Sequence, residues 1–262
     1  MLLLSVGADA EETPMKPRKS TYLIHRWLGL IVSLQLLAWS VGGFMFSVLD
    51  IDNVRGERDI GAEQFEPLSH HVITELPASI RSSLDDLAST HSDLASVALI
   101  NRGIGPSWEI RSTSGELLAR LDHESGESLP LISEQDARLV AQRDFAHASP
   151  IKNVQLIESE PPVEFRNGVL PAYRVEIHHP KQPRLYIDAR TGQVVSRRNR
   201  LWRVFDFFWM LHTMDYGGRD DFNHPLLTGF SVLAIATSAS GVTLWGWRAS
   251  SRLRRKRNQG PA

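Results

Sequence analysis

The stretch AYRVEIHHPKQPRLYIDARTGQVVS, from Ala172 to Ser196, decides the fold that we expect for the middle of the chain. Apolar and polar residues alternate in AYRVEI and again in RLYID, and this period-two alternation is typical of half-buried strands. Thr191 and Gly192 follow the second strand, and glycine is the residue that a tight turn most often requires. The stretch therefore predicts three short strands joined by tight connections.

A second stretch with the same pattern lies upstream: SWEIRSTSGELLARLDHESGESLP, from Ser107 to Pro130. Within it LDHESGES matches IDARTGQV position for position, so that Asp122 corresponds to Asp188 and Gly126 to Gly192. Self-similarity of this kind indicates a duplicated structural unit.

A helical segment precedes each stretch. Residues 75–90 have apolar side chains at helical spacing, and residues 133–147 begin with Ser133 as an N-cap and Asp136 as its partner in an approximate capping box. We therefore predict an α+β domain over residues 50–200, built from two tandem units at about 69–130 and 131–198. Each unit would be a helix followed by a three-stranded antiparallel sheet, and the pair would share one core.

Two runs without any charged residue enclose this domain. They extend from Trp27 to Leu49 and from Pro225 to Trp247, about 23 residues each, whereas the whole chain is 23% charged and has a formal net charge of -1. About 20 apolar residues suffice for a helix to cross a bilayer. We therefore predict a membrane protein with transmembrane helices at residues 21–49 and 224–248, and the lipid bilayer as one partner.

The distribution of Lys and Arg predicts the orientation. Basic residues concentrate just outside the two charge-free runs, at Lys16, Arg18, Lys19 and Arg26 and at Arg248, Arg252, Arg254, Arg255, Lys256 and Arg257. The positive-inside rule then places both termini in the cytoplasm, as a disordered tail (1–20) and a basic tail (249–262). Residues 50–223 would be periplasmic, with an amphipathic interfacial helix and loop at 201–223. Because the basic tail adjoins a span, we predict no nucleic-acid partner.

The chain has no cysteine, which excludes disulfides, thiolate iron–sulfur ligation and covalent attachment of a c-type haem. No P-loop and no dinucleotide-binding glycine motif is present. A metal or a haem would therefore have to be held by His, Met or carboxylate side chains.

The helix and strand patterns, together with HRWLGL before the first span and LHTMDY before the second, resemble PepSY domains and the PepSY-associated transmembrane proteins of bacterial inner membranes. The resemblance extends from about Tyr22 to Arg248 and is strongest from Ala172 to Trp247. Some members of this siderophore-iron-reductase-like family reduce ferric siderophores with b-type haems that are held by helix histidines. Better-known members have more spans than the two predicted here, so a haem would have to be shared with another chain.

The resemblance implies that His25, His212 and His224 bind haem, with His25 and His212 as iron ligands. His25 and His224 lie at opposite ends of the spans, roughly 30 Å apart, so one iron cannot use both. Two copies of His25 could hold an inner haem in a four-helix bundle formed by a homodimer, or another membrane subunit could complete the site. Small residues in the second span would allow close helix approach: Thr228, Gly229, Ser231, Thr237, Ser238, Ser240, Gly241, Thr243 and Gly246.

Structural roles for the same residues stay open. His25 could be an interfacial anchor, and His224 could be a helix-entry residue before Pro225. Gln35, polar within the first span, is expected to face protein or a cavity. The adjacent pairs His70–His71 and His178–His179 would point to opposite faces of a strand, so we do not expect either pair to share a metal.

The leading functional hypothesis is an inner-membrane electron-transfer protein that binds haem b and reduces periplasmic ferric iron or an iron chelate, as a haem-dependent metalloreductase would. The alternative is a non-enzymatic, membrane-anchored PepSY module that binds or regulates a periplasmic protein, or an accessory subunit of a membrane complex. The sequence names no catalytic residue for either hypothesis.

Overall fold

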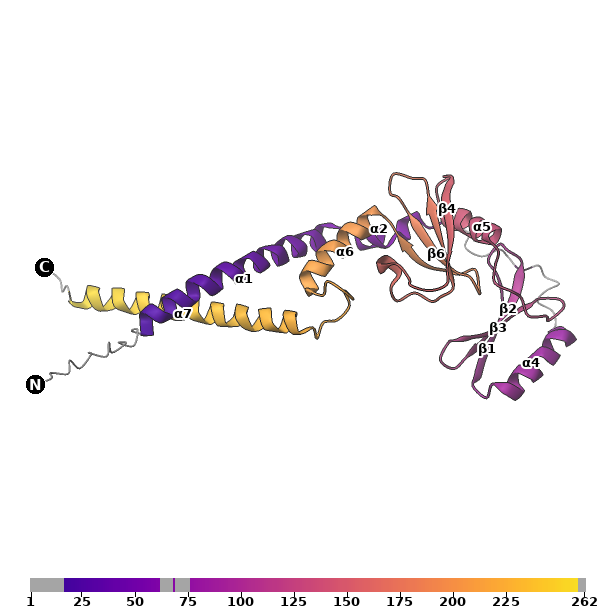
Figure 1. The fold of residues 1–262 in the computed structure, drawn as a ribbon, viewed down its shortest axis with the longest axis horizontal. Coiled ribbons are helices and arrows are strands. Elements are labelled where there is room, and N and C mark those ends of the chain that lie inside the picture. The colour runs from indigo at the N-terminus through magenta and orange to yellow at the C-terminus, as the bar shows by residue number, and fades with distance from the viewer. Residues whose placement is uncertain (1–16, 62–67, 69–75, 259–262) are drawn as a thin grey trace, which may run out of the picture. The chain divides into compact units, whose positions relative to one another are not determined.

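The computed structural model describes residues 17–61, 68 and 76–258 (Figure 1). The chain divides into two compact units, one formed by Met1–Phe44 and Trp209–Ala262, the other by Met45–Phe208. The His70–His71 pair, most of the predicted N-terminal tail and residues 259–262 lie outside the described residues.

The first unit contains the two long helices, α1 (Pro17–Val48) and α7 (Pro225–Asn258). Both are long and apolar enough to cross a membrane, over Thr21–Val48 and Pro225–Leu253. Only 11% of the apolar segment of α1 and 0% of that of α7 is buried. Core helices of soluble proteins bury their apolar faces, so this exposure is what a lipid environment would favour. Both helices extend beyond the predicted spans, and α7 continues through basic residues that form helix readily.

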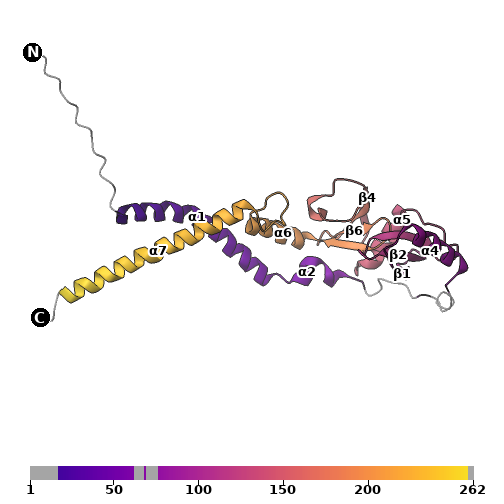
Figure 2. The same cartoon turned by 90° about the horizontal axis from the view of Figure 1, so that it is seen from below.

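Helices α1 and α7 cross in both views (Figures 1 and 2), and small or polar residues lie at contacts that α1 makes with α7 and α6. A Cβ atom added to Gly29 of α1 would lie 3.9 Å from Thr237 Cγ2 of α7. Gln35 Nε2 donates a hydrogen bond of 3.0 Å to the carbonyl of Leu211 in α6 (Arg200–Thr213). The expectation that Gln35 faces protein is thereby confirmed.

The second unit holds two antiparallel sheets. The first has the order β1-β2-β3, from Leu94–Asn101, Pro106–Ser112 and Leu117–Asp122. Helix α4 (Ala78–Thr90) packs on it through Ile80, which is fully buried with Ile110 and Leu121. These residues form a small apolar core that belongs to the first repeat.

The second sheet has four strands in the order β4-β5-β6-β7. They are Ile151–Ile157, Ala172–Ile177, Arg184–Asp188 and Val194–Arg198. Helix α5 (Glu134–Asp144) covers one face, and the predicted capping box of Ser133 and Asp136 is present with both hydrogen bonds. The other face is covered by the short helix η2 (Val163–Phe165), whose Phe165 stacks on Tyr186 at a centroid distance of 4.2 Å.

The predicted helix with a three-stranded antiparallel sheet is confirmed in the first repeat, although its strands are not the three predicted, and it is wrong in the second repeat, which has four strands. An additional strand, β1 or β4, follows each helix, and the third strand predicted for the first repeat is only a single bridge between Leu121 and Ser128. β1 and β4 lie at sheet edges with mostly half-exposed side chains, so neither has a clean alternation. The predicted common core is also wrong, because the described apolar clusters belong to separate sheets. Ile104 is the residue of the first repeat that packs on the core between α5 and the second sheet.

The predicted correspondence of the two turns is confirmed. Gly126 N donates to Asp122 O at 3.1 Å, and Gly192 N donates to Asp188 O at 2.8 Å. In both turns the residue after the glycine accepts from the backbone N–H of the aspartate at 2.9 Å. Both glycines have positive φ, 73° and 76°.

Two short helices precede the repeats, α2 (Ile51–Arg55) and η1 (Glu57–Asp59). They are tied to the end of the second sheet, because Asn199 Nδ2 donates to the carbonyl of Asn53 at 2.7 Å.

Candidate functional site

His25 lies between α1 and α7 of the same chain. Its Nδ1 is 2.7 Å from Ser240 Oγ, which in turn donates its hydrogen to the carbonyl of Thr237 at 2.8 Å. When Ser240 donates its one hydrogen to Thr237, it accepts from His25, and the neutral imidazole then has its proton on Nδ1. Nε2 therefore carries the lone pair, which is the form a metal ligand needs.

The glycine beside His25 allows this contact. A Cβ atom added to Gly241 would lie 3.2 Å from Cε1 of the imidazole, closer than most side-chain contacts. Thr237, Ser240 and Gly241, which we expected to promote self-association, thus contact α1 of the same chain.

His224 has a different role in the structure. Its Nδ1 accepts a hydrogen bond of 3.2 Å from the backbone N–H of Leu226, and its carbonyl accepts one of 3.1 Å from Thr228. His224 therefore caps α7, in agreement with the helix-entry alternative. Because Nδ1 is the acceptor, the neutral ring has its proton on Nε2 and keeps no lone pair for iron.

His212 lies in the last turn of α6, with its ring 5.8 Å from that of Trp39 in α1. Trp39 follows His25 by 14 residues in the same helix, which corresponds to about 21 Å of helix rise. The structure therefore does not bring His25 and His212 together within one chain. Residues 17–61, 68 and 76–258 contain no group of three His, Cys, Asp or Glu side chains that could hold a metal ion.

The loop between His212 and His224 is organised by Asp215. Its carboxylate accepts hydrogen bonds from the backbone N–H groups of Gly217, Gly218, Asp220 and Asp221 at 3.0 to 3.2 Å. These bonds, the one from Asp221 first, hold the pKa of Asp215 below its usual range. We missed this role, although an aspartate two residues before a Gly-Gly pair is a known signal for such a turn.

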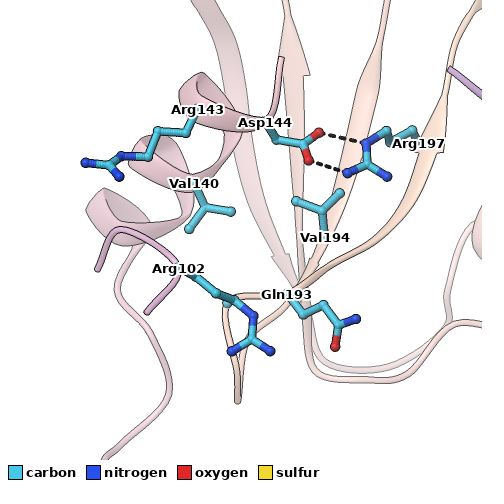
Figure 3. A pocket seen from close by; sticks show the side chains of 8 residues that line it. Arg102, Val140, Arg143, Asp144, Gln193, Val194 and Arg197 are labelled. Carbon is cyan, nitrogen blue, oxygen red and sulfur yellow. Dashed lines mark hydrogen bonds and ion pairs between the residues drawn. The ribbon is translucent and has the colours of Figure 1, made fainter. Parts of the chain in front are cut away.

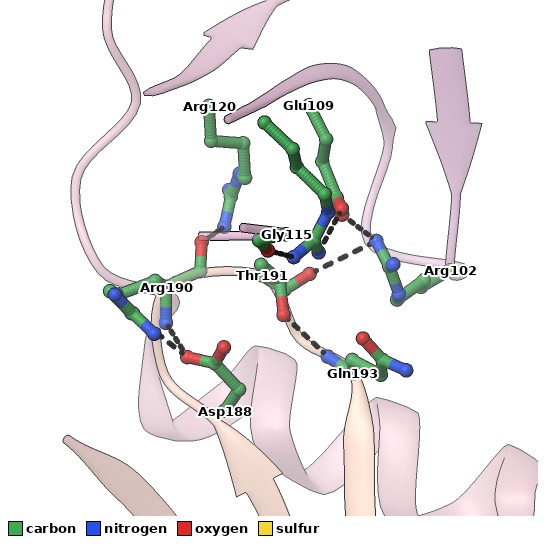
Figure 4. Close-up of polar contacts among 9 residues, drawn as sticks. Arg102, Glu109, Gly115, Arg120, Asp188, Arg190, Thr191 and Gln193 are labelled. Carbon is green, nitrogen blue, oxygen red and sulfur yellow. Dashed lines mark hydrogen bonds and ion pairs between the residues drawn. The ribbon is translucent and has the colours of Figure 1, made fainter. Parts of the chain in front are cut away.

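A buried polar centre lies between the two repeats (Figure 4). Glu109, only 1% exposed, pairs with Arg102 and with Arg111, the latter at 2.7 Å. Arg102 also donates to the carbonyl of Thr191 at 3.4 Å, and Arg120 donates to that of Arg190 at 2.8 Å. Burial lowers the pKa of Arg120. The first sheet therefore contacts the second repeat through arginines that reach its turn.

Beside this centre is a cavity of about 120 Å³ (Figure 3). Asp144, at the end of α5, forms a two-pronged ion pair with Arg197 of β7 on one side of it. The lining residues are Arg102, Val140, Arg143, Asp144, Gly192, Gln193, Val194 and Arg197. Sequence reasoning missed this cavity because its residues come from three separate segments.

A second polar cluster surrounds Asp59. Lys181 Nζ donates to its two carboxylate oxygens at 2.7 and 2.9 Å, and His147 Nε2 lies 3.1 Å from Oδ1. Burial raises the pKa of Asp59, but these two partners outweigh it and lower the pKa overall. His179 stacks on His147 at 5.2 Å.

No family model matches the chain, and neither a curated protein nor a solved structure matches it.

Proposed function

We propose that this chain is a bacterial inner-membrane protein that holds haem b and passes electrons to a periplasmic acceptor, ferric iron or an iron chelate. Both termini would be cytoplasmic, and residues 50–223, with two PepSY-like repeats, would be periplasmic. The observation that carries the proposal is the position of the His25 ring, whose Nδ1 lies 2.7 Å from Ser240 Oγ.

His25 would hold the haem iron through Nε2, and Ser240 would orient its ring. Histidines that bind metals typically donate their second ring N–H to a neighbouring acceptor, which fixes the tautomer and the ring orientation. Ser240 is such an acceptor for His25. A second histidine ligand would be His25 of another copy in a four-helix arrangement, and a bound haem would supply a one-electron carrier.

We also propose that His212 is an iron ligand of a second haem, on the outer side of the membrane. His212 ends α6 beside Trp39, at a different level of α1 from His25. His224 supports the proposal less, because its Nδ1 already accepts the bond that caps α7.

The absorption spectrum of the purified full chain tests the proposal. After expression with ample haem supply and extraction in mild detergent, we expect a Soret band and a haem b pyridine complex. The inner haem should be present at about one per two chains, because each chain supplies one His25 ligand. A colourless protein, with no haem bound after addition of hemin, would contradict the proposal.

The second candidate is a non-enzymatic anchored module that binds a periplasmic partner. His25 and His224 favour it, because each already has a hydrogen-bonding role within the chain. A colourless protein that still captures a periplasmic partner through Met45–Phe208 would favour this candidate.

The proposed orientation has its own test. A reporter that is active only in the periplasm should be active when fused near Ser125 and silent when fused after Ala262. The reverse pattern would place the two repeats in the cytoplasm and exclude a periplasmic acceptor.

A further inference from the structure

We propose that the arginine-lined cavity of the second unit binds a small oxyanion, namely a phosphate or carboxylate group. The cavity lies within Met45–Phe208, and the proposal does not depend on haem. Three arginines, Arg102, Arg143 and Arg197, line it, and Asp144 is the one acidic residue in its described lining (Figure 3). Among the described lining residues, arginines therefore outnumber carboxylates.

Two of the arginines are already fixed in place. Arg197 uses Nε and Nη2 in its ion pair with the buried Asp144. Arg102 uses Nη1 in its hydrogen bonds to Glu109 and to the carbonyl of Thr191. Their side chains are only 22% and 10% exposed. A guanidinium has five N–H donors, so each arginine can hold its protein partner and still donate to a ligand. Ordering them costs the ligand little, because the protein has ordered them already.

The third arginine is positioned by a glycine. A Cβ atom added to Gly103 would lie 2.5 to 2.7 Å from three atoms of the Arg143 guanidinium. Arg143 therefore lies flat against the loop between β1 and β2, where a side chain larger than glycine would displace it. The same loop of the first repeat carries Arg102. This loop therefore positions both Arg102 and the Arg143 side chain of α5 at the cavity.

The size and the walls of the cavity select the ligand. A volume of about 120 Å³ is roughly that of four water molecules in the liquid, enough for one phosphate or carboxylate group. Val140 and Val194 add apolar wall, which strengthens interactions between charges. Arginine favours phosphate and carboxylate because its planar fork donates two parallel hydrogen bonds to such groups.

Isothermal titration calorimetry on the full chain in a non-ionic detergent tests this inference, with inorganic phosphate and acetate as separate probes at constant ionic strength. We expect saturable binding of at least one probe. Arg143→Gln should weaken binding at least about fivefold, because it removes a charge-assisted donor. Arg138→Gln is the matched control: Arg138 is on the same helix, pairs with Glu134 and does not line the cavity.

Gln193→Glu provides a second variant in case Arg143→Gln does not fold. It adds a negative charge to the lining and should weaken binding by a similar factor. Binding of phosphate alone or of acetate alone would support the site and identify its ligand. Absence of saturable binding in the parent, or equal weakening by Arg138→Gln, would overturn the inference.

Discussion

Each sheet packs its helix against one face, and the two sheets differ in what covers the opposite face. The strand registers make Glu109 and Arg120 of the first sheet equivalent to Arg174 and Tyr186 of the second. In the first sheet this face is ionic and meets the second repeat through Arg102 and Arg120. In the second sheet η2 covers this face and Phe165 stacks on Tyr186, while the half-buried Arg174, Glu176 and Arg184 form ion pairs around them.

The two equivalent turns differ in the same way. The turn at Gly126 packs on its own repeat, where Ser79 and Ser83 of α4 donate to the carbonyls of Glu124 and Gly126. The turn at Gly192 instead meets Ile104 of the other repeat. The repeated sequence pattern thus sets strands and turns, while the residues around it decide whether a copy packs on itself or on its neighbour.

The largest expected effect is at the ionic face. Glu109→Ala should destabilise the second unit by about 3–5 kcal/mol, because it leaves two arginines without their buried carboxylate. Arg174→Ala, at the equivalent site, should cost only about 1 kcal/mol, since its bonds to Gln155 and Glu176 lie nearer solvent. Urea unfolding of residues 45–208, which we expect to fold alone, would measure both. Equal losses would remove the proposed difference between the faces.

The effect of intermediate size is the loss of stability when alanine replaces the glycine of either turn. Both glycines have positive φ, so alanine should cost about 1 kcal/mol or more at either position. At Gly126 the new Cβ would also lie 3.0 Å from the backbone of Ser79, whereas at Gly192 it meets the flexible end of Ile104 at 2.8 Å. We therefore expect Gly126→Ala to lower the unfolding midpoint more than Gly192→Ala. The opposite order would show that contact between the repeats dominates.

The smallest expected effect is on the loss of stability at acid pH. Burial raises the pKa of Glu164, but the hydrogen bond from Tyr186 and the pair with Arg184 outweigh it, so its pKa lies below the usual 4.5. Its contribution to stability is complete above pH 4.5 and is lost as the pH falls through the lowered value. Glu164→Gln should therefore reduce the acid sensitivity of thermal unfolding measured from pH 6 to pH 3, roughly the range in which carboxylates titrate. An unchanged pH profile would contradict this role.

The sequence predicted the elements whose signals are local. The cap at Ser133, the strands β5 to β7 and the two turns follow from alternation, capping and glycine positions. Strands β1 and β4 were missed because edge strands tolerate irregular patterns, and η2 was missed because its Pro-rich surroundings have no periodicity. The contacts at the candidate sites were more difficult to predict from the sequence than the secondary structure. The pairs His25–Ser240 and Arg102–Glu109 depend on which helix face or sheet face meets its neighbour, and short-range sequence patterns do not specify this.

The most direct test of the central claim, that His25 holds an inner haem, is the haem content of three variants of the full chain beside the parent. His25→Ala should lose the inner haem from both copies of a dimer, because one substitution removes both axial ligands. Arg26→Ala, its neighbour at the same level of α1, should keep the parental spectrum. His224→Ala should also keep the inner haem, because His224 caps α7 instead. Full haem occupancy in His25→Ala, or a parent that binds no haem, would contradict the account.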